Sequence, residues 1–192
     1  MSASAGTSGV STLWGAMVES GRLERERKAR GHAVIERDRL PVEVTPFGIL
    51  RWYLHPGLEG PNTRAIYFCE LEIPEGSRSG KIRHQGGLVH YVVEGQGYTD
   101  LDGAVHEWER RDIIALPPRP KGVVFQHVNT GPGRVRIVIA FPNFDSSLGS
   151  EMGVALEVLS PAPEYAEAQA VPPATSQPQE PRSGPAAARS PG

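Results

Sequence analysis

From Val42 onward, apolar and polar residues alternate in short runs that are rich in β-branched and aromatic residues. Alternation with period two is typical of strands that bury one face. Gly, Pro and Asp separate the runs, and Asp102-Gly103 between two of them is a strong hairpin signal. Since no helical pattern interrupts the series, we expect an all-β fold, a closed or two-sheet antiparallel barrel such as a jelly roll. The predicted strands are 48–54, 65–73, 88–94, 97–101, 104–108, 112–116, 123–129 and 135–140.

The segments on either side of this barrel, which we place at residues 41–148, have a different texture. Residues 1–40 are predicted to form an N-terminal arm with a short helix, for which Ser11 is a suitable N-cap. A second short helix is predicted over residues 149–160. Residues 161–192 are rich in Pro, Ala, Ser and Gln and predict a disordered tail. The apolar face of the first helix would contain Leu13, Trp14, Met17 and Val18.

Composition narrows the function classes. A net charge of −2 over 192 residues provides no bulk basic field to attract nucleic acid or an anionic membrane. The basic run from Arg22 to Arg30 is interleaved with glutamates and is interpreted as a solvated helix face. No apolar run approaches the ~20 residues that a membrane span needs, and residues 1–9 lack the pattern of a secretory signal. We therefore expect neither a nucleic acid nor a membrane as partner.

The chain has one cysteine, Cys69, so an intrachain disulfide is impossible and a reducing, cytoplasmic location is expected. Cys69 follows the apolar residues 66–68 and is interpreted as a small buried hydrophobe rather than a nucleophile.

Three of the six histidines lie where strand geometry could bring them together. His84 closes a turn at residues 80–84, His90 lies on the following strand, and His127 lies on a late strand. Because strand side chains alternate, His84 and His90 share one face, and all three imidazoles converge if both strands turn these faces inward. Three converging imidazoles suit a divalent metal with open coordination positions, while single buried histidines that only pack or form hydrogen bonds are the simpler alternative.

Residues 80–129 carry a set of short motifs that resembles a known family. They include His84-Gln85-Gly86-Gly87, the stretch 91–98 (YVVEGQGY), Asp102-Gly103, Pro117-Pro118 and the stretch 122–129 (GVVFQHVN). The resemblance is to the cupins, and more closely to small single-domain bacterial cupins related to gentisate dioxygenases. It implies an all-β, cupin-type antiparallel jelly-roll β-barrel, a small-molecule substrate inside the barrel and a homodimer.

The sequence departs from that family at the positions that usually hold the metal. The family pattern implies a histidine at Ile82, a glutamate at Leu88 and a histidine at Phe125, so of the usual ligands only His84 is present. Two accounts remain open. Either the site has moved along the barrel, so that His84, His90 and His127 bind Fe(II) or another divalent transition metal, or the metal has been lost and these histidines perform acid–base chemistry or pack.

Three functions are compatible with this pattern. The first is an oxidoreductase, a metal-dependent dioxygenase of the non-haem iron type. The second is a metal-independent isomerase, cyclase or lyase that uses His84, His90 or His127 catalytically. The third is a non-catalytic small-molecule-binding protein. Tyr98, Asn129, Gln126 and Tyr67 are candidates to hold the second ring nitrogens of the histidines. The residues expected to line the substrate pocket are Trp52, Tyr67, Tyr91, Tyr98, Trp108, Phe125 and Asn129.

Overall fold

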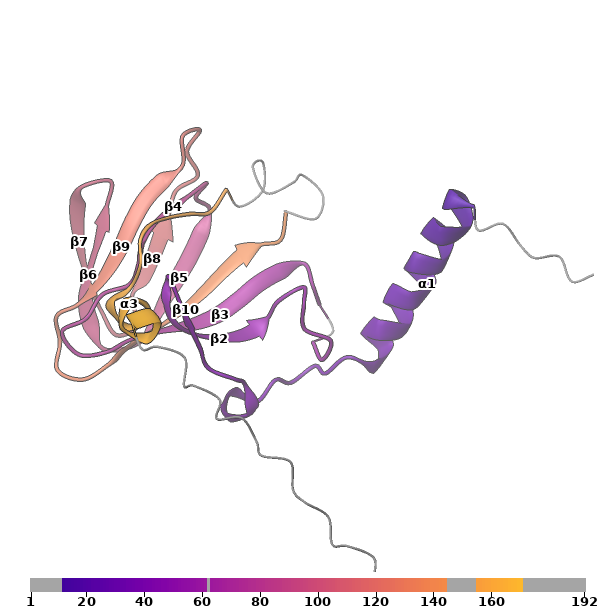
Figure 1. Ribbon diagram of the computed structural model, residues 1–192, viewed down its shortest axis with the longest axis horizontal. Helices are drawn as coiled ribbons and strands as arrows, with labels where there is room; N and C mark the ends of the chain where they lie inside the picture. Colours follow the sequence, from indigo (N-terminus) through magenta and orange to yellow (C-terminus); the bar gives the residue numbers. More distant parts are fainter. Residues whose placement is uncertain (1–11, 62, 145–154, 171–192) are drawn as a thin grey trace, which may run out of the picture.

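The computed structural model describes residues 12–61, 63–144 and 155–170. Two antiparallel sheets face each other and enclose the core, as in a jelly roll (Figure 1). The six-stranded sheet has the order β1 (Glu43–Thr45), β2 (Gly48–Leu54), β3 (Ile66–Ile73), β10 (Val135–Pro142), β5 (Leu88–Glu94), β8 (Ile113–Leu116). The five-stranded sheet has the order β11 (Glu157–Ser160), β4 (Lys81–His84), β9 (Val123–Asn129), β6 (Gln96–Leu101), β7 (Ala104–Glu109).

The all-β barrel is confirmed, and the eight predicted strands agree with the observed ones to within two residues at each end. Asp102 and Gly103 form the expected hairpin, with φ angles of 53° and 88° that place Leu101 opposite Ala104. The expected turn at residues 80–84 is wrong, because Lys81–His84 is strand β4. It pairs with β9, so Ile82 lies directly opposite Phe125. This pairing is non-local, and the local pattern of a four-residue strand does not predict it.

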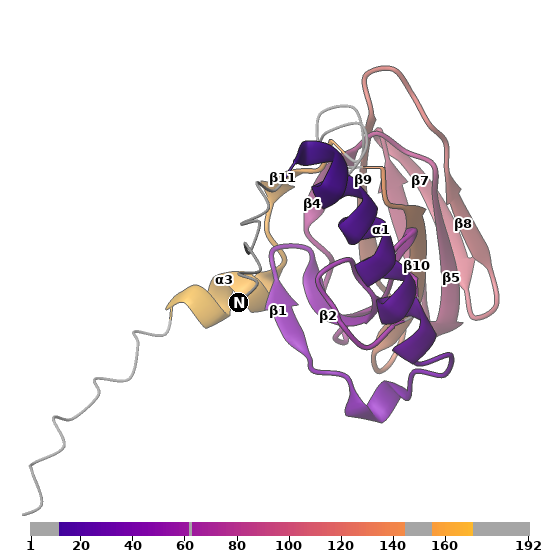
Figure 2. The same ribbon diagram turned by 90° about the vertical axis from the view of Figure 1, so that its right-hand side faces the viewer.

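The predicted N-terminal helix is present as α1 (Leu13–Arg30), and Gly31 ends it. Its N-cap is Thr12 rather than Ser11, since the Thr12 hydroxyl accepts a hydrogen bond from Gly15 N–H. No residue of α1 is buried, and the helix stands beside the barrel (Figures 1 and 2). A hydrogen bond from Arg27 Nη1 to the Pro61 carbonyl oxygen connects it to the loop between β2 and β3.

The predictions for the C-terminal segment are wrong within the described residues. Within the expected helix at 149–160, Glu157–Ser160 is instead strand β11, which pairs with β4 and forms the edge of the five-stranded sheet. Residues 163–170, expected to begin a disordered tail, form helix α3 (Pro163–Ala170). Ala162 N–H donates to the Pro46 carbonyl, which fixes the start of α3 against the barrel. The remainder of the predicted tail, 171–192, lies outside the described residues.

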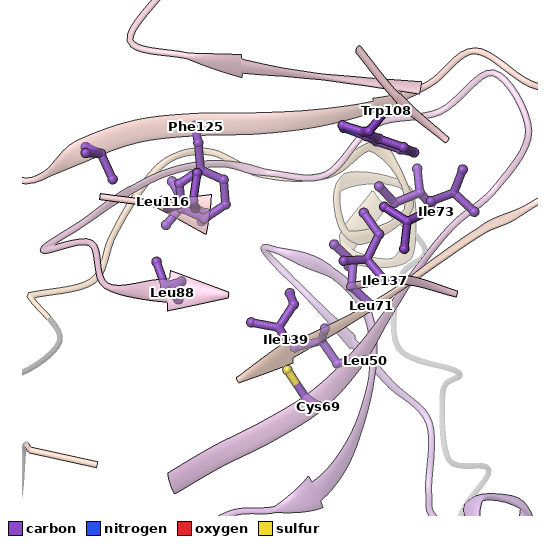
Figure 3. Close-up of a cluster of buried hydrophobic side chains, with 14 residues drawn as sticks. Leu50, Cys69, Leu71, Ile73, Leu88, Trp108, Leu116, Phe125, Ile137 and Ile139 are labelled. Carbon is purple, nitrogen blue, oxygen red and sulfur yellow. The ribbon is translucent and has the colours of Figure 1, made fainter. Parts of the chain in front are cut away.

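The core lies between the two sheets and is filled by alternate residues of their inner faces (Figure 3). The burial pattern of β9 alternates along its whole length, as expected for a strand with one face in the core. Cys69 is buried among these side chains, as predicted, and burial raises the pKa of its thiol to about 12. The thiol is therefore protonated and contributes to the apolar wall of the barrel.

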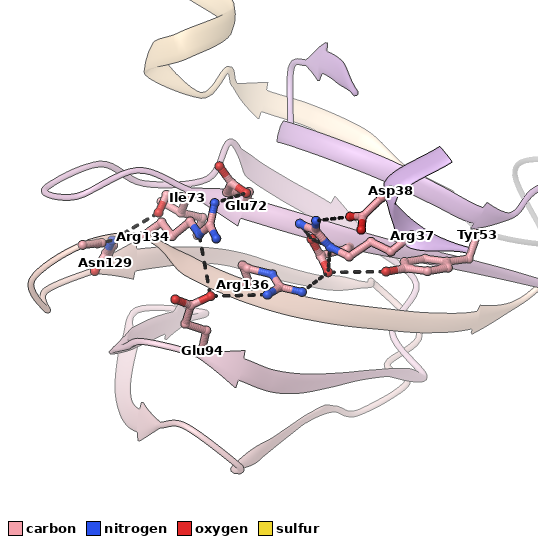
Figure 4. A network of polar contacts seen from close by, with 11 residues as sticks. Arg37, Asp38, Tyr53, Glu72, Ile73, Glu94, Asn129, Arg134 and Arg136 are labelled. Atoms are coloured by element: carbon pink, nitrogen blue, oxygen red, sulfur yellow. Dashed lines mark hydrogen bonds and ion pairs between the residues drawn. The ribbon is translucent and has the colours of Figure 1, made fainter. Parts of the chain in front are cut away.

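The outer face of the six-stranded sheet carries a polar network in which Figure 4 labels Arg37, Tyr53 and Arg136. All three contact Glu70, which is 2% exposed. Arg37 Nη2 donates to Glu70 at 2.6 Å and Arg136 Nη2 at 2.7 Å. Burial raises the pKa of Glu70, but the bonds from these two guanidinium groups outweigh it and hold the pKa at about 2. Because Arg37 belongs to the N-terminal arm, the network ties this arm to strand β3.

None of the helices in the described part of the chain has the length and apolar character needed to cross a membrane.

Candidate functional site

The structure brings His84, His90 and His127 together inside the barrel. His84 ends β4, His90 is the third residue of β5 and His127 lies near the end of β9, so the three come from both sheets. All three are at most 4% exposed. The expected convergence of their faces is therefore confirmed, although their roles within the site differ.

A cavity of about 330 Å³ opens beside two of these histidines. His84 and His90 line it, whereas His127 lies behind His90 and does not. A volume of this size suits a small organic ligand. The other polar groups in the wall are Thr45 and the protonated thiol of Cys69. The apolar wall includes Leu50, Trp52, Ile82, Leu88, Phe125 and Phe141.

The apolar wall contains all three positions at which the sequence lacks the expected metal ligands. Ile82, Leu88 and Phe125 are buried and line the cavity, and Ile82 and Phe125 are a cross-strand pair. These three positions thus contribute hydrocarbon to the cavity wall in place of imidazole and carboxylate, beside the imidazoles of His84 and His90.

The two nitrogens of His127 are both used in hydrogen bonds. Its Nδ1 lies 2.7 Å from Thr99 Oγ1, and its Nε2 lies 2.9 Å from Nδ1 of His90. Trp108 Nε1–H donates to the same Thr99 oxygen at 2.9 Å. The chain of contacts runs from Trp108 through Thr99 and His127 to His90, entirely among buried side chains.

The ring of His84 is oriented by the backbone. Gly86 N–H donates to His84 Nδ1 at 2.9 Å, so Nδ1 carries a lone pair. An imidazole that accepts at Nδ1 is neutral and carries its proton on Nε2. His84 is therefore a hydrogen-bond donor at Nε2.

These contacts do not fit the three histidines as a metal-binding set. A metal binds a lone pair of a neutral imidazole, but both nitrogens of His127 are engaged and Nε2 of His84 carries a proton. Nε2 of His90 is buried and has no hydrogen-bond partner among the described residues. No group of three histidine, cysteine, aspartate or glutamate side chains suited to a metal occurs in residues 12–61, 63–144 and 155–170.

Burial keeps the two inner imidazoles neutral. Removal from water lowers the pKa of His90 well below its usual range, and the neighbouring His127 and His84 lower it further. Burial alone lowers the pKa of His127. His90 is thus a neutral ring at physiological pH, with Nε2 on the side away from His127.

The expected pocket residues divide into four groups. Trp52 and Phe125 line the cavity. Tyr67 is one step removed and stacks on the lining residue Phe141, with ring centroids 4.7 Å apart. Tyr91 and Tyr98 do not contribute, because each lies one residue out of phase with the inner face of its strand; Tyr91 is 42% exposed.

Two further predicted pocket residues are buried but serve other contacts. Trp108 donates to Thr99. The side-chain amide of Asn129 donates to the carbonyls of Ile73, Pro74 and Gly133, so it holds loops rather than a ligand.

Sequence reasoning missed Thr99, the residue that contacts His127. The candidates for that contact were Tyr98, Asn129, Gln126 and Tyr67, of which none bonds to His127 in the described contacts. Thr99 lies directly opposite His127 because β6 pairs with β9. The alternation along β6 was a usable signal, because it places Thr99 on the inner face of the strand and Tyr98 on the outer face. To connect Thr99 with His127, however, the pairing of β6 with β9 must also be known.

Comparisons with known proteins place the fold. The family described as "Cupin domain" matches residues 69–141, and no curated protein matches the sequence. Among solved structures, the chain is similar to the polyketide cyclase RemF from Streptomyces resistomycificus, with 15% identity over 73% of this chain and 94% of that one and a TM-score of 0.52.

Two other solved structures are similar at comparable levels. The plu4264 protein from Photorhabdus luminescens has 13% identity over 61% of this chain and 92% of that one, with a TM-score of 0.50. The salicylate 1,2-dioxygenase from Pseudoaminobacter salicylatoxidans, in complex with gentisate, has 18% identity over 75% of this chain but 37% of that one, with a TM-score of 0.49. At identities this low, the similarities to RemF and to the plu4264 protein show a shared fold and no more.

Proposed function

We propose that this chain, of which residues 69–141 match the cupin domain family, is a metal-independent cupin enzyme. It would bind a small, mostly apolar organic molecule in the barrel and act on a carbonyl group of that molecule. The observation that supports this proposal most strongly is the pair of neutral histidines in an otherwise apolar cavity, in which Nε2 of His84 is a hydrogen-bond donor and Nδ1 of His90 is engaged by His127.

Neutral imidazole is a suitable group for polarising a carbonyl. Its N–H donates to the carbonyl oxygen, and the bond strengthens as negative charge develops there during the reaction. A low-dielectric wall increases this effect, because little water competes for the donor. His90 is the first candidate for this role, since its Nε2 is buried and has no partner in the described structure.

The composition of the wall favours an intramolecular reaction. Among the described residues no carboxylate lines the cavity, and the Cys69 thiol is protonated, so these residues supply no strong general base to the wall. In a cyclisation of an enol onto a carbonyl of the same molecule, the enol proton can become the proton of the new hydroxyl group. The protein then needs mainly to fold the molecule and to stabilise the oxyanion. That a polyketide cyclase shares the fold supports this by analogy alone.

We predict that a carbonyl probe bound in the cavity accepts a hydrogen bond from His90. Acetophenone and ethylbenzene are a matched pair that differs in this acceptor. The wild-type protein should bind acetophenone about tenfold more tightly, which corresponds to one hydrogen bond of about 1.4 kcal/mol. The infrared carbonyl stretch of bound acetophenone should move to lower frequency. Both effects should disappear in His90→Phe.

His106→Phe is the matched control, because His106 is exposed on β7 outside the cavity. It should leave both measurements unchanged. Equal binding of the two probes by the wild-type protein would contradict the proposal. So would a substrate that is turned over only after Fe²⁺ is added and only in the presence of O₂.

A further inference from the structure

We infer that Trp108, Thr99 and His127 form a positioning chain that determines which nitrogen of His90 carries the proton. The inference rests on the proposed role of His90 as a donor. It goes beyond that role by assigning a function to three side chains that do not touch the cavity.

The direction of these hydrogen bonds is set at one end by the Trp108 indole. Trp108 Nε1–H can only donate, so Thr99 Oγ1 accepts from it at 2.9 Å. The hydroxyl proton of Thr99 then needs an acceptor of its own. Among the described residues, the other polar atom in contact with this hydroxyl is His127 Nδ1, at 2.7 Å. Thr99 therefore donates to His127.

The direction of the hydrogen bond at His127 determines which nitrogen of His90 carries the proton. Because Nδ1 of His127 accepts, its proton lies on Nε2. That N–H points at His90 Nδ1, 2.9 Å away, and donates to it. His90 in turn carries its proton on Nε2, the nitrogen without a partner. The reverse arrangement would leave the buried Thr99 hydroxyl proton without an acceptor, which carries an energetic cost.

The strands hold the members of this chain in place. Thr99 and His127 are direct partners in the β6–β9 pairing. The Ser79 hydroxyl accepts from the backbone N–H of His127 at 2.9 Å. On the neighbouring strand, the Trp108 ring packs over Gly97, where an added Cβ would lie 2.7 Å from the ring. Glycine at this position thus lets the indole reach Thr99.

The test compares Thr99→Val, which removes the hydroxyl at nearly constant shape, with Thr99→Ser, which keeps it. Histidine labelled with ¹⁵N shows by NMR which ring nitrogen is protonated, and the measurement needs neither a substrate nor turnover. We expect His90 and His127 to be Nε2–H tautomers in the wild-type protein and in Thr99→Ser. In Thr99→Val we expect a second population in which His90 is protonated at Nδ1.

Two results would overturn the inference. One is a wild-type His90 that carries its proton on Nδ1. The other is a Thr99→Val protein whose His90 remains entirely the Nε2–H tautomer. The spectra of Thr99→Val also report whether the variant is folded. If the tautomers behave as expected but acetophenone and ethylbenzene bind equally, the positioning chain stands and the proposed function fails.

Discussion

Two buried imidazoles that share a hydrogen bond, His90 and His127, are the chemically distinctive residues of this barrel. Both nitrogens of His127 and Nδ1 of His90 form hydrogen bonds within the protein. Of these two rings, only His90 lines the cavity, and its Nε2 is left for a ligand. A buried neutral histidine destabilises the folded protein when its ring nitrogens lack hydrogen-bond partners. The contacts to Thr99 and between the rings limit that loss to one atom, Nε2 of His90, which is the atom that a ligand can satisfy.

We predict that the free energy of unfolding falls as the pH drops below about 6.5. Unfolded histidines bind protons in this range, whereas burial lowers the pKa of His90 and His127 in the folded state. Protons therefore favour the unfolded state, by about 1.4 kcal/mol per pH unit for each ring. Urea denaturation between about pH 7.5 and pH 5 measures this slope.

Variants separate the two rings from other titrating groups. His90→Phe should remove about half of the slope, while His106→Phe at the exposed position should leave it unchanged. The Glu70 carboxyl, with a pKa of about 2, loses its stabilising effect only below about pH 4.5, outside the measured range. An identical slope in His90→Phe and the wild-type protein would contradict the assignment.

At the residue scale, parity along each strand was predictable and partners across strands were not. The inward faces of His84, His90 and His127 follow from alternation. The same rule, applied to Tyr91 and Tyr98, would have placed both outside the cavity. The hydrogen bond from Thr99 to His127 depends on the pairing of β6 with β9, which joins residues 28 positions apart.

The turn after β4 is the element that orients His84. Gly86 has a φ of 95°, and its N–H donates to His84 Nδ1. A Cβ at Gly86 would lie 2.1 Å from the Pro117 carbonyl oxygen. The neighbouring Gly87 also has a positive φ, 72°, but an added Cβ there meets nothing within 4 Å. Substituting Gly87 thus tests the backbone conformation alone, whereas substituting Gly86 tests the backbone conformation together with the close contact to Pro117.

We predict that Gly86→Ala lowers the free energy of unfolding by more than about 2 kcal/mol, because a strained φ and a collision with the backbone add together. Gly87→Ala should cost about 1 kcal/mol, the usual penalty of a left-handed φ for a residue with a side chain. Urea denaturation of both variants gives the comparison. Equal losses would contradict a role for the contact with Pro117.

At the element scale, eight strands were predictable to within two residues, including the edge strands β7 and β8, whereas the short strands β1, β4 and β11 were not. β4 and β11 have four residues each; they pair with each other, and β4 also pairs with β9. Their local sequences contain too few residues to show a period. At Glu157–Ser160, pairing with the distant strand β4 overrides the local preference for a helix.

At the scale of the whole molecule, a family resemblance predicted the barrel but not its chemistry. The fold places a cavity where such barrels hold a ligand, and Ile82, Leu88 and Phe125 make its wall apolar. The departures at these three positions were visible in the sequence, and they left a moved metal site and a lost one equally open. Hydrogen-bond directions at His84 and His127 favour the second account. The homodimer and the cytoplasmic location remain predictions.

The measurement that tests this account most directly is the metal content of protein purified without a metal-affinity tag, before and after incubation with Fe²⁺ and removal of the excess. The account predicts less than about a tenth of an equivalent of any transition metal in both samples, because two of the three histidines have no lone pair to offer. About one equivalent of metal that is lost in His84→Ala and in His127→Ala would contradict it and would restore the three histidines as a ligand set.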